Sequence, residues 1–471
     1  MDLDKLKRIQ SLKVIISETI MVIAVVLMVT VLALIVSGYW LNSDFQIERQ
    51  GLLQISSVPT GANIYIDGDS SWLQKTNTSK VLSSGEHTIT LSKDGYDTWS
   101  KTINITEGLL YRLHYPRLFL KNRTPEKVFN FKNITFATVS PEHDKLVLIN
   151  ETANWDYLEL DNEILTSQKI DMQKYLSNIG VADSLDSSTE WTFHGKILSS
   201  EWDNDGSHVL FSIDNDSNIE WILLDVKNSK NSINISKEFG ANFHHIKILD
   251  NSSNNLLAVQ NGNLHKIDVS GRSISSILVK DVIDFDHYNN EIIFSAKDDE
   301  QENSYYLGLT KVGDTKTIKL DSFSVPSKVA IYKFYDDKYI ATLSENLFSI
   351  FKLENFEKVF ESELSFSPAS IKVGHNSEFI IMNTGSKIAT FDMEAFSLNE
   401  WMVDGESFGW VDNNMIFSIS ENKLIVYDFD GNNRRELAEN VSGAFPAMIT
   451  NNKWLYYFDD SNLIREWLIP R

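Results

Sequence analysis

Closely spaced carboxylates are the residues of this chain with the clearest capacity for chemistry. Asp203-Asn204-Asp205-Gly206 and the pair Asp428/Asp430 place acidic side chains at alternate positions, a spacing that Ca²⁺-binding loops use. An EF-type loop also needs a Glu at its twelfth position, but the twelfth residue from Asp203 is Asp214. The apolar run Val209-Leu210-Phe211 between them has the character of a strand. Both acidic pairs are therefore predicted to lie in plain β-turns.

Other catalytic and metal-binding patterns are missing from the sequence. His244 and His245 are adjacent, so on a strand they would point to opposite faces and could not share a metal ion. The ten histidines include no His-x-x-x-His or His-Glu-x-x-His spacing. There is no Gly-x-Ser-x-Gly elbow and no nucleotide-binding fingerprint. We predict no catalytic residues, no metal and no cofactor, and the sequence assigns no binding residues.

Two groups of residues leave alternatives open. A pair of acids for glycoside hydrolysis is defined by its distance in space, so 65 Asp and Glu residues offer many coincidental pairs. The run Asp298-Asp299-Glu300-Gln301-Glu302 is predicted to be a solvated hairpin tip. Aromatic residues such as Phe351, Phe391 and Tyr427 are predicted to be core, although some aromatics could stack on a sugar or peptide.

A repeat positions most of these residues. From about residue 128 onward, an apolar strand, a polar turn and a second strand recur, best seen in residues 201–213 followed by 221–225. Ile170–Glu190 forms an insertion, in which Met172–Leu176 is a candidate short helix. The spacing of the later units fits a four-stranded propeller blade. The units begin near Phe136, Leu198, Ile246, Val282, Val329, Ile371, Phe408 and Ala444.

Three segments of the repeat resemble TolB-type and WD40-like blades. The segments are Ser140-Pro141-Glu142, Trp202-Asp203-Asn204-Asp205-Gly206 and Asp428–Arg435, the last matching the outer hairpin of a blade. The resemblance implies a β-propeller over about 340 residues. Eight units predict eight blades, and seven is the alternative if a terminal unit is shared to close the ring.

A smaller β-module precedes the repeat. Apolar and polar residues alternate in short runs between Leu53 and Leu113, which is the period of half-buried strands. Asp67-Gly68 and Asp94-Gly95 are hairpin signals. Gly61 suits a turn with positive φ. The expected bulky core residues are Tyr65, Trp72, Tyr96 and Trp99.

This module resembles the PEGA domain, an all-β module of surface and envelope proteins. The resemblance rests on Ser57–Ala62, Ile64–Gly68, Gly85-Glu86-His87 and Gly95-Tyr96. The family turn reads Pro59-Thr60-Gly61-Ala62, with Thr in place of the usual Glu, and residues 71–77 replace a Gly-x-Thr-Pro turn. The resemblance implies a binding or spacing module outside a membrane.

A membrane anchor is predicted at the N-terminus. Thr19–Ser43 contains no charged residue, and an apolar helix of this length spans the roughly 30 Å hydrocarbon core. Tyr39 and Trp40 would lie at the interface. Lys5, Lys7, Arg8 and Lys13 predict a cytoplasmic N-terminus. The alternative is a signal peptide, but the run is long and Val36-Ser37-Gly38 is a poor cleavage site.

Composition narrows the compartment and the partners. The first 43 residues hold four basic and three acidic residues. The exported remainder therefore has 39 Lys and Arg against 62 Asp and Glu, a net charge of about −23. Such a surface repels nucleic acid and anionic lipid headgroups. The chain has no Cys, so no disulfide braces the exported part, which fits a bacterial envelope better than a eukaryotic secretory route.

The sequence therefore predicts an all-β protein with one N-terminal transmembrane α-helix, a PEGA-like β-sandwich and a 7- or 8-bladed β-propeller. The predicted parts are a cytoplasmic tail 1–18, an anchor 19–42, a stalk 43–51, the PEGA-like domain 52–116 and the propeller 117–471. The expected role is non-catalytic binding of a wall polymer or partner protein at the cell envelope. The alternatives are a glycan hydrolase or lyase with its site in the propeller mouth, and a sensor acting through a partner.

Overall fold

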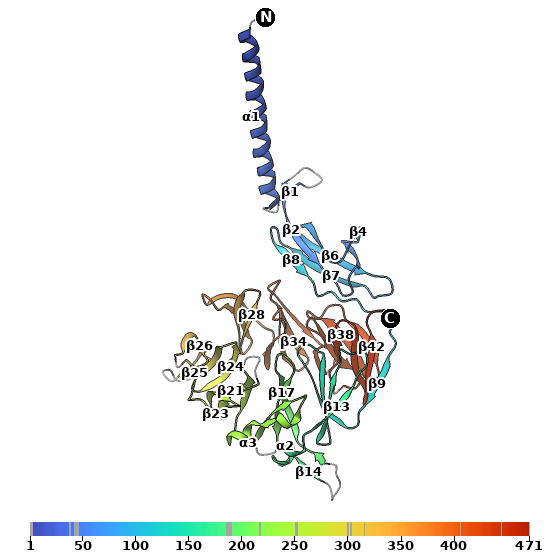
Figure 1. Ribbon diagram of the computed structural model, residues 1–471, viewed down its shortest axis with the longest axis vertical. Helices are drawn as coiled ribbons and strands as arrows, with labels where there is room; N and C mark the ends of the chain where they lie inside the picture. The colour runs from blue at the N-terminus through green and yellow to red at the C-terminus, as the bar shows by residue number, and fades with distance from the viewer. Residues whose placement is uncertain are drawn as a thin grey trace. The chain divides into compact units, whose positions relative to one another are not determined.

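The chain folds into two compact units, Met1–Lys121 and Asn122–Arg471, each described below by itself (Figure 1). The computed structural model describes residues 3–36, 39–41, 47–184, 191–215, 218–249, 253–298, 301, 304–314, 316–405, 407–443 and 445–470. Parts of several predictions lie outside the described residues. They are Ser37 and Gly38 of the cleavage site, most of the run Asp298–Glu302, the start of the eighth repeat at Ala444, and the side chains of the N-terminal lysines, Trp40 and Trp72.

The first unit begins with one long helix, α1 (Leu3–Val36). Its segment Ile16–Leu34 has a mean hydropathy of 2.4 and no buried residue, so it is long and apolar enough to cross a membrane. The helix ends before the predicted boundary at residue 42, because Tyr39–Leu41 forms strand β1 and pairs with β2 (Ile47–Ile55). The Gly at position 38 also lowers helix propensity at this point.

Two four-stranded sheets follow in the first unit. Alternation places one side of each strand in a shared core, which includes Leu53, Ile89 and Trp99, none of them exposed. Because β2 starts at Ile47, residues 47–51 of the predicted stalk belong to the sheet. The first sheet contains β1, β2, β5 (Thr78–Ser83) and β8 (Leu110–Leu113), and the second contains β3 (Asn63–Ile66), β4 (Asp69–Lys75), β6 (Gly85–Ser92) and β7 (Trp99–Ile105).

The turn signals of this unit are confirmed. Asp67 and Gly68 have φ values of 54° and 84° and join β3 to β4 as an antiparallel hairpin. Gly61 has a φ of 77°, a value that L side chains adopt rarely. Tyr96 and Trp99 are buried, as expected for the bulk of a small core, whereas Tyr65 is only half-buried.

In the residues that the structure describes, the second unit contains eight four-stranded antiparallel sheets, each made of strands in sequence order except the last. Seven of the eight predicted repeat starts lie within the first strand of a sheet. The first four sheets are β10 (Ile134–Val139) to β13 (Ser167–Asp171) with β11 (Lys145–Asn150) and β12 (Asn154–Glu159); β16 (Lys196–Trp202), β17 (His208–Asp214), β18 (Ile219–Asp225) and β19 (Ile233–Asn234); β20 (His245–Ile248), β21 (Asn255–Gln260), β22 (Asn263–Asp268) and β23 (Ser273–Ile274); and β24 (Val282–Tyr288), β25 (Glu291–Lys297), β26 (Tyr305–Lys311) and β27 (Ile318–Phe323).

The remaining four sheets follow the same order. They are β28 (Ser327–Phe334), β29 (Asp337–Ser344), β30 (Leu347–Lys352) and β31 (Glu357–Glu363); β32 (Ser370–Val373), β33 (Phe379–Thr384), β34 (Lys387–Asp392) and β35 (Ser397–Met402); β36 (Ser407–Trp410), β37 (Met415–Ser420), β38 (Lys423–Asp428) and β39 (Arg435–Glu439); and β40 (Met448–Thr450), β41 (Trp454–Asp459) and β42 (Asn462–Trp467) with β9 (Glu126–Asn130).

The insertion between the first two sheets contains the predicted short helix, α2 (Gln173–Ser177), and the small pair β14 (Ala182–Ser184) and β15 (Trp191–Phe193). Two further short helices follow, η1 (Ser229–Asn231) between β18 and β19, and α3 (Ile235–Phe239) between β19 and β20.

Neighbouring sheets pack face to face through apolar clusters. Val147 of β11 and Phe211 of β17 belong to one such cluster, and Leu223 of β18 and Ile246 of β20 belong to the next. The last sheet returns to the first, since Leu146 of β11 shares a cluster with Tyr456 of β41. Sequential sheets that pack on one another and close on themselves form a β-propeller.

Gly51 gives a test of the packing between the two sheets of the first unit. A Cβ at this position would lie 2.4 Å from Cγ2 of Ile105 and 2.7 Å from the backbone oxygen of Thr106. Gly51→Ala should therefore destabilise this unit by about 1–3 kcal/mol through overpacking, measured by urea unfolding. Ser79→Ala on the neighbouring strand, an exposed position, is the matched control. Equal stability of the two variants would contradict the close approach of the sheets.

Candidate functional site

The first strands of the propeller sheets form its inner lining. Among them, β24 and β28 lie side by side, as do β28 and β32, and β16 and β20. A first strand pairs with a partner on one side only, so its other edge carries backbone N–H groups that need acceptors. We call β16, β20, β24, β28 and β32 the inner strands.

Carboxylates from one inner strand accept hydrogen bonds from the edge of the next. Glu201 Oε1 accepts from the backbone N–H of Ile248 at 3.1 Å. Asp284 Oδ2 accepts from Val329 N–H at 2.9 Å, and Asp286 Oδ2 accepts from Ile331 N–H at 2.9 Å. These acids therefore fasten adjacent sheets together along the axis and satisfy donors that the sheets leave unpaired.

Lys247 joins this group of acids. Its ammonium lies 2.7 Å from Asp286 Oδ1, and the two side chains are 24% and 21% exposed. Burial lowers the pKa of Lys247, but the charges of Asp286 and Glu201 outweigh that effect and raise it, so the lysine stays charged. His287 completes the link between strands through its Nε2, which lies 2.8 Å from the Ile248 carbonyl oxygen.

Burial sets the protonation of three other groups here. It raises the pKa of Glu201 to about 7, against the lowering effect of Lys247. Burial likewise raises the pKa of Asp284. Burial and then the charge of Lys247 lower the pKa of His245 to about 4, so this imidazole is neutral at pH 7.

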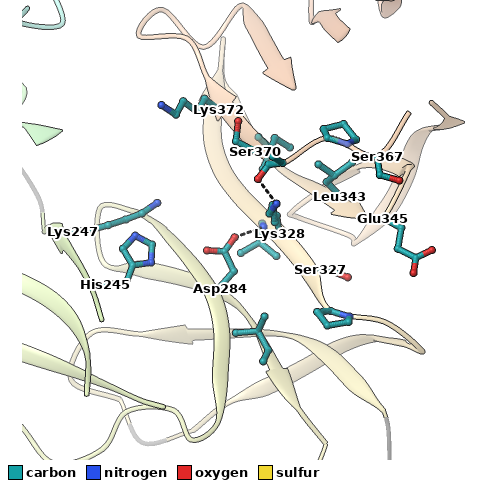
Figure 2. Close-up of a pocket in the computed structure, with 16 residues that line it drawn as sticks. His245, Lys247, Asp284, Ser327, Lys328, Leu343, Glu345, Ser367, Ser370 and Lys372 are labelled. Carbon is teal, nitrogen blue, oxygen red and sulfur yellow. Dashed lines mark hydrogen bonds between the residues drawn. The ribbon is translucent and has the colours of Figure 1, made fainter. Parts of the chain in front are cut away.

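A cavity of about 620 Å³ opens at one end of the inner strands. Figure 2 shows Lys247, His245 and Asp284 on one side of it and Ser370 and Lys372 on another. Between them, the Lys328 ammonium donates a hydrogen bond to the carbonyl oxygen of Ala369. The lining also includes Glu345, Ser327, Ser367, Pro326 and Pro368.

This lining can recognise polar groups of either charge. Lysine ammonium groups bind carboxylates and phosphates, and serine hydroxyls both donate and accept. Three lysines around one cavity stand out in a chain with a formal net charge of −22. We call this cavity, with Lys247, Lys328 and Lys372, the lysine cavity.

A second cavity of about 500 Å³ lies at the other end of the same strands, where its lining includes Glu201, His287 and His375. His375 Nε2 is 2.8 Å from Glu142 Oε1, which links the turn after β32 to the turn after β10. His143 lies in the same turn as Glu142, and burial lowers its pKa although Asp412 counteracts it. The lining is more polar and holds fewer cations than the lysine cavity.

Of the acidic residues that suggested Ca²⁺, Asp203, Asp205 and Asp430 lie in connections between strands, as predicted, whereas Asp428 is the last residue of β38. Asp203 Oδ1 accepts from the N–H groups of Ser207 and His208 at 2.8 and 2.9 Å. Although burial raises the pKa of Asp203, hydrogen bonds with the side chain and backbone N–H of His208, and then with Ser207, lower it to about 2. Asp430 Oδ1 accepts from Asn432 N–H at 3.1 Å. In the described part of the chain, no group of three His, Cys, Asp or Glu residues is placed to hold a metal ion.

Other sequence predictions also have clear outcomes. His244 is exposed and lies in a bend directly before β20, whereas His245 is the first residue of β20 and is partly buried. Phe351, Phe391 and Tyr427 are buried core residues. The inner-strand acids and Lys247 match no motif, and sequence reasoning missed them. Their one signal is a charge that recurs at alternate positions of an apolar strand, as in Asp284-Phe285-Asp286.

Residues 50–117 match the family profile of the PEGA domain. The first unit therefore contains a PEGA domain. The match covers β2 to β8 and agrees with the two-sheet sandwich described above. No curated protein matches the chain at a significant level.

Solved structures similar to this chain are propellers and enzymes of low sequence identity. The Dos1 propeller has a TM-score of 0.43 and 12% identity, covering 74% of this chain and 95% of its own. Hsv2p of Kluyveromyces lactis has a TM-score of 0.42 and 9% identity, covering 65% and 98%. An oligogalacturonate lyase from Vibrio parahaemolyticus has a TM-score of 0.38 and 12% identity, covering 57% and 88%. Similarity at this level says nothing about the chemistry of the two cavities.

Glu201 predicts a pH dependence of stability in the propeller. Its folded pKa of about 7 lies above the ordinary value of 4.5, so its favourable contribution is present at low pH and is lost as the pH rises through 7. Relative to Glu201→Gln, the wild type should lose up to about 3 kcal/mol of unfolding free energy between pH 5 and 8. Urea unfolding of residues 47–471 at several pH values measures this difference. Parallel pH profiles for the two proteins would contradict it.

Proposed function

We propose that this chain is a non-catalytic binding or scaffolding protein of the cell envelope. In this proposal α1 anchors it in the cytoplasmic membrane with the N-terminus inside, and both folded units lie outside. The PEGA domain then acts as a spacer near the bilayer. The propeller binds a wall polymer or a partner protein at the lysine cavity.

The lysine cavity is the observation that supports this proposal most. It combines a volume of about 620 Å³ with ammonium, hydroxyl and carboxylate groups at the axis of the propeller. The nearby acids Glu201, Asp284 and Asp286 already accept hydrogen bonds from backbone N–H groups. Those bonds suit a structural role for the acids. Lys247 and Lys328 are also bonded within the protein, to Asp286 and to the Ala369 carbonyl oxygen, so recognition in this proposal depends chiefly on the exposed Lys372.

The ligand class follows from the charges. Acidic groups dominate the propeller, so an anionic polymer would be repelled by most of its surface and attracted at the lysine cavity. Carboxylate or phosphate groups carried on a hydroxyl-rich chain would satisfy the lysines and serines together. A wall polymer with acidic substituents, or an acidic protein segment, has this chemistry.

One observation favours the enzymatic alternative. Glu201 has a pKa of about 7, in the range in which a carboxyl group can act as a general acid at neutral pH, and it lies beside Lys247 and Asp286. A glycan hydrolase or lyase built on this group would need Glu201 to reach its substrate through the second cavity, which it lines.

Lys372→Glu tests the binding proposal. Lys372 is an exposed residue of the lysine cavity, so its reversal should leave the fold intact and weaken binding to isolated envelope fractions by about tenfold. Lys333→Glu is the control, because Lys333 is equally exposed on β28 but lies outside this cavity. Co-sedimentation with purified wall material measures both. An equal loss of binding in the two variants would mean that the change in net charge causes it, and would contradict a binding site at the lysine cavity.

The enzymatic alternative has its own test. Residues 44–471 are incubated with cell-wall glycans, and released fragments are separated by chromatography. The binding proposal predicts no fragments from either the wild type or Glu201→Gln. Cleavage by the wild type that Glu201→Gln abolishes, with folding retained, would replace binding with catalysis.

A further inference from the structure

One face of the PEGA domain carries an exposed apolar row. Leu52 on β2 pairs with Val81 on β5 and with Leu110 on β8, so the three side chains are neighbours on one face of the sheet. They are 39%, 37% and 39% exposed. We call these three residues the apolar row.

The row breaks the rule that the outer face of a sandwich is polar. The opposite face of β2 is fully buried, since Leu53 and Ile55 have no exposed surface. Alternation would therefore place polar residues at the position of Leu52 and its neighbours. The next positions on the same face do follow the rule, because Gln54 pairs with Ser79 and with Arg112. Contiguous apolar side chains bordered by polar ones mark an interaction surface.

Strand pairing keeps the apolar row close to the end of α1. Tyr39, three residues after the end of the helix, is paired with Arg49, and Leu52 follows three residues later. With about 3.3 Å per residue along a strand and about 5 Å between strands, Leu52 lies within about 25 Å of Val36. A helix that crosses the bilayer would therefore hold the row within reach of the outer lipid surface.

The net charges of the two units suit a PEGA domain next to the lipid surface, since that domain is much less acidic than the propeller. Residues 47–121 contain eight Lys and Arg against seven Asp and Glu, a net charge of about +1. Residues 122–471 contain 31 Lys and Arg against 54 Asp and Glu, a net charge of about −23. An anionic lipid surface repels the propeller but not the PEGA domain, and Arg112 adds a cation on the face that carries the row.

We propose that the apolar row docks on the lipid bilayer surface and seats the PEGA domain there, with leucine and valine side chains in the interfacial region. This inference rests on the membrane anchor of the proposed function, and it gives the PEGA domain a binding surface in place of a purely spacing role. Interfacial binding of this kind gains from the apolar area removed from water and from cations near anionic headgroups.

The absence of Cys from the sequence makes a direct test possible. Val81→Cys in the full chain is labelled with an environment-sensitive fluorophore and reconstituted in vesicles of phosphatidylethanolamine and phosphatidylglycerol. Spin-labelled lipids should quench this label severalfold more than a label at Asn104→Cys, an exposed position on β7 in the other sheet. Adding Leu110→Asp to the Val81→Cys protein should return its emission to that of an aqueous label.

Each other outcome overturns the proposal in a recognisable way. Equal quenching at positions 81 and 104 means that the row faces water. A label at position 81 that is shielded from water, is not quenched by lipid and depends on protein concentration means that a second copy of the chain covers the row. Release of the protein from the vesicles by an alkaline wash overturns the anchor and the docking together, whereas retention with a water-exposed label overturns the docking alone.

Discussion

Closure of the propeller depends on one pairing between distant parts of the chain. Strand β9, at the start of the second unit, completes the last sheet by pairing with β42, with Asn130 opposite Asn462 and Glu126 opposite Arg465. Arg465 also lies 3.1 Å from Glu126, and Arg123 lies 2.9 Å from Glu466. Without this strand the last sheet would end in an open edge. Both cavities and the inner-strand acids depend on the closed ring.

The residues inside the ring also meet a requirement for pairing the backbone groups of strand edges. Each sheet presents one strand edge to the axis, and its N–H groups need acceptors. Glu201, Asp284 and Asp286 supply them from the neighbouring sheet, at distances of 2.9 to 3.1 Å. Lys247 then balances the carboxylates that this solution brings together. The charged axis is thus a consequence of how the sheets are fastened, and the lysine cavity lies where that arrangement opens to solvent.

The PEGA domain and the propeller meet different physical demands. A module of this size has few residues for a core, and it relies on Trp99, Tyr96 and the close approach that Gly51 permits. The propeller gains stability from packing between successive sheets, and its solvated turns tolerate sequence drift. This difference explains why the turn residues of the PEGA domain could be identified in the sequence, whereas most propeller blades were recognisable only by the spacing of their repeats.

Sequence reasoning located elements well and sites poorly. Periodicity and turn residues predicted the sandwich hairpin at Asp67-Gly68, the short helix after Met172 and the first strand of seven sheets. Local physics determines those features. The predicted end of the helix α1, at residue 42, was too late. The pairing of Tyr39–Leu41 with β2 is a contact between separate segments, which local sequence patterns do not reveal. Sequence reasoning also left the blade number between seven and eight, since the fourth strand of the last sheet comes from the other end of the unit.

The sequence by itself determined the apolar helix, the β-character of both units, the repeat and the uneven distribution of charge. Each of these depends on residue type and on neighbours within a few positions. Only the tertiary structure decided that Glu201, Lys247 and Asp286 meet at the axis, and that Leu52, Val81 and Leu110 form one row. Those residues lie tens of positions apart, and strand register together with ring closure brings them together. Register and closure are properties of the whole chain, so no local pattern encodes them.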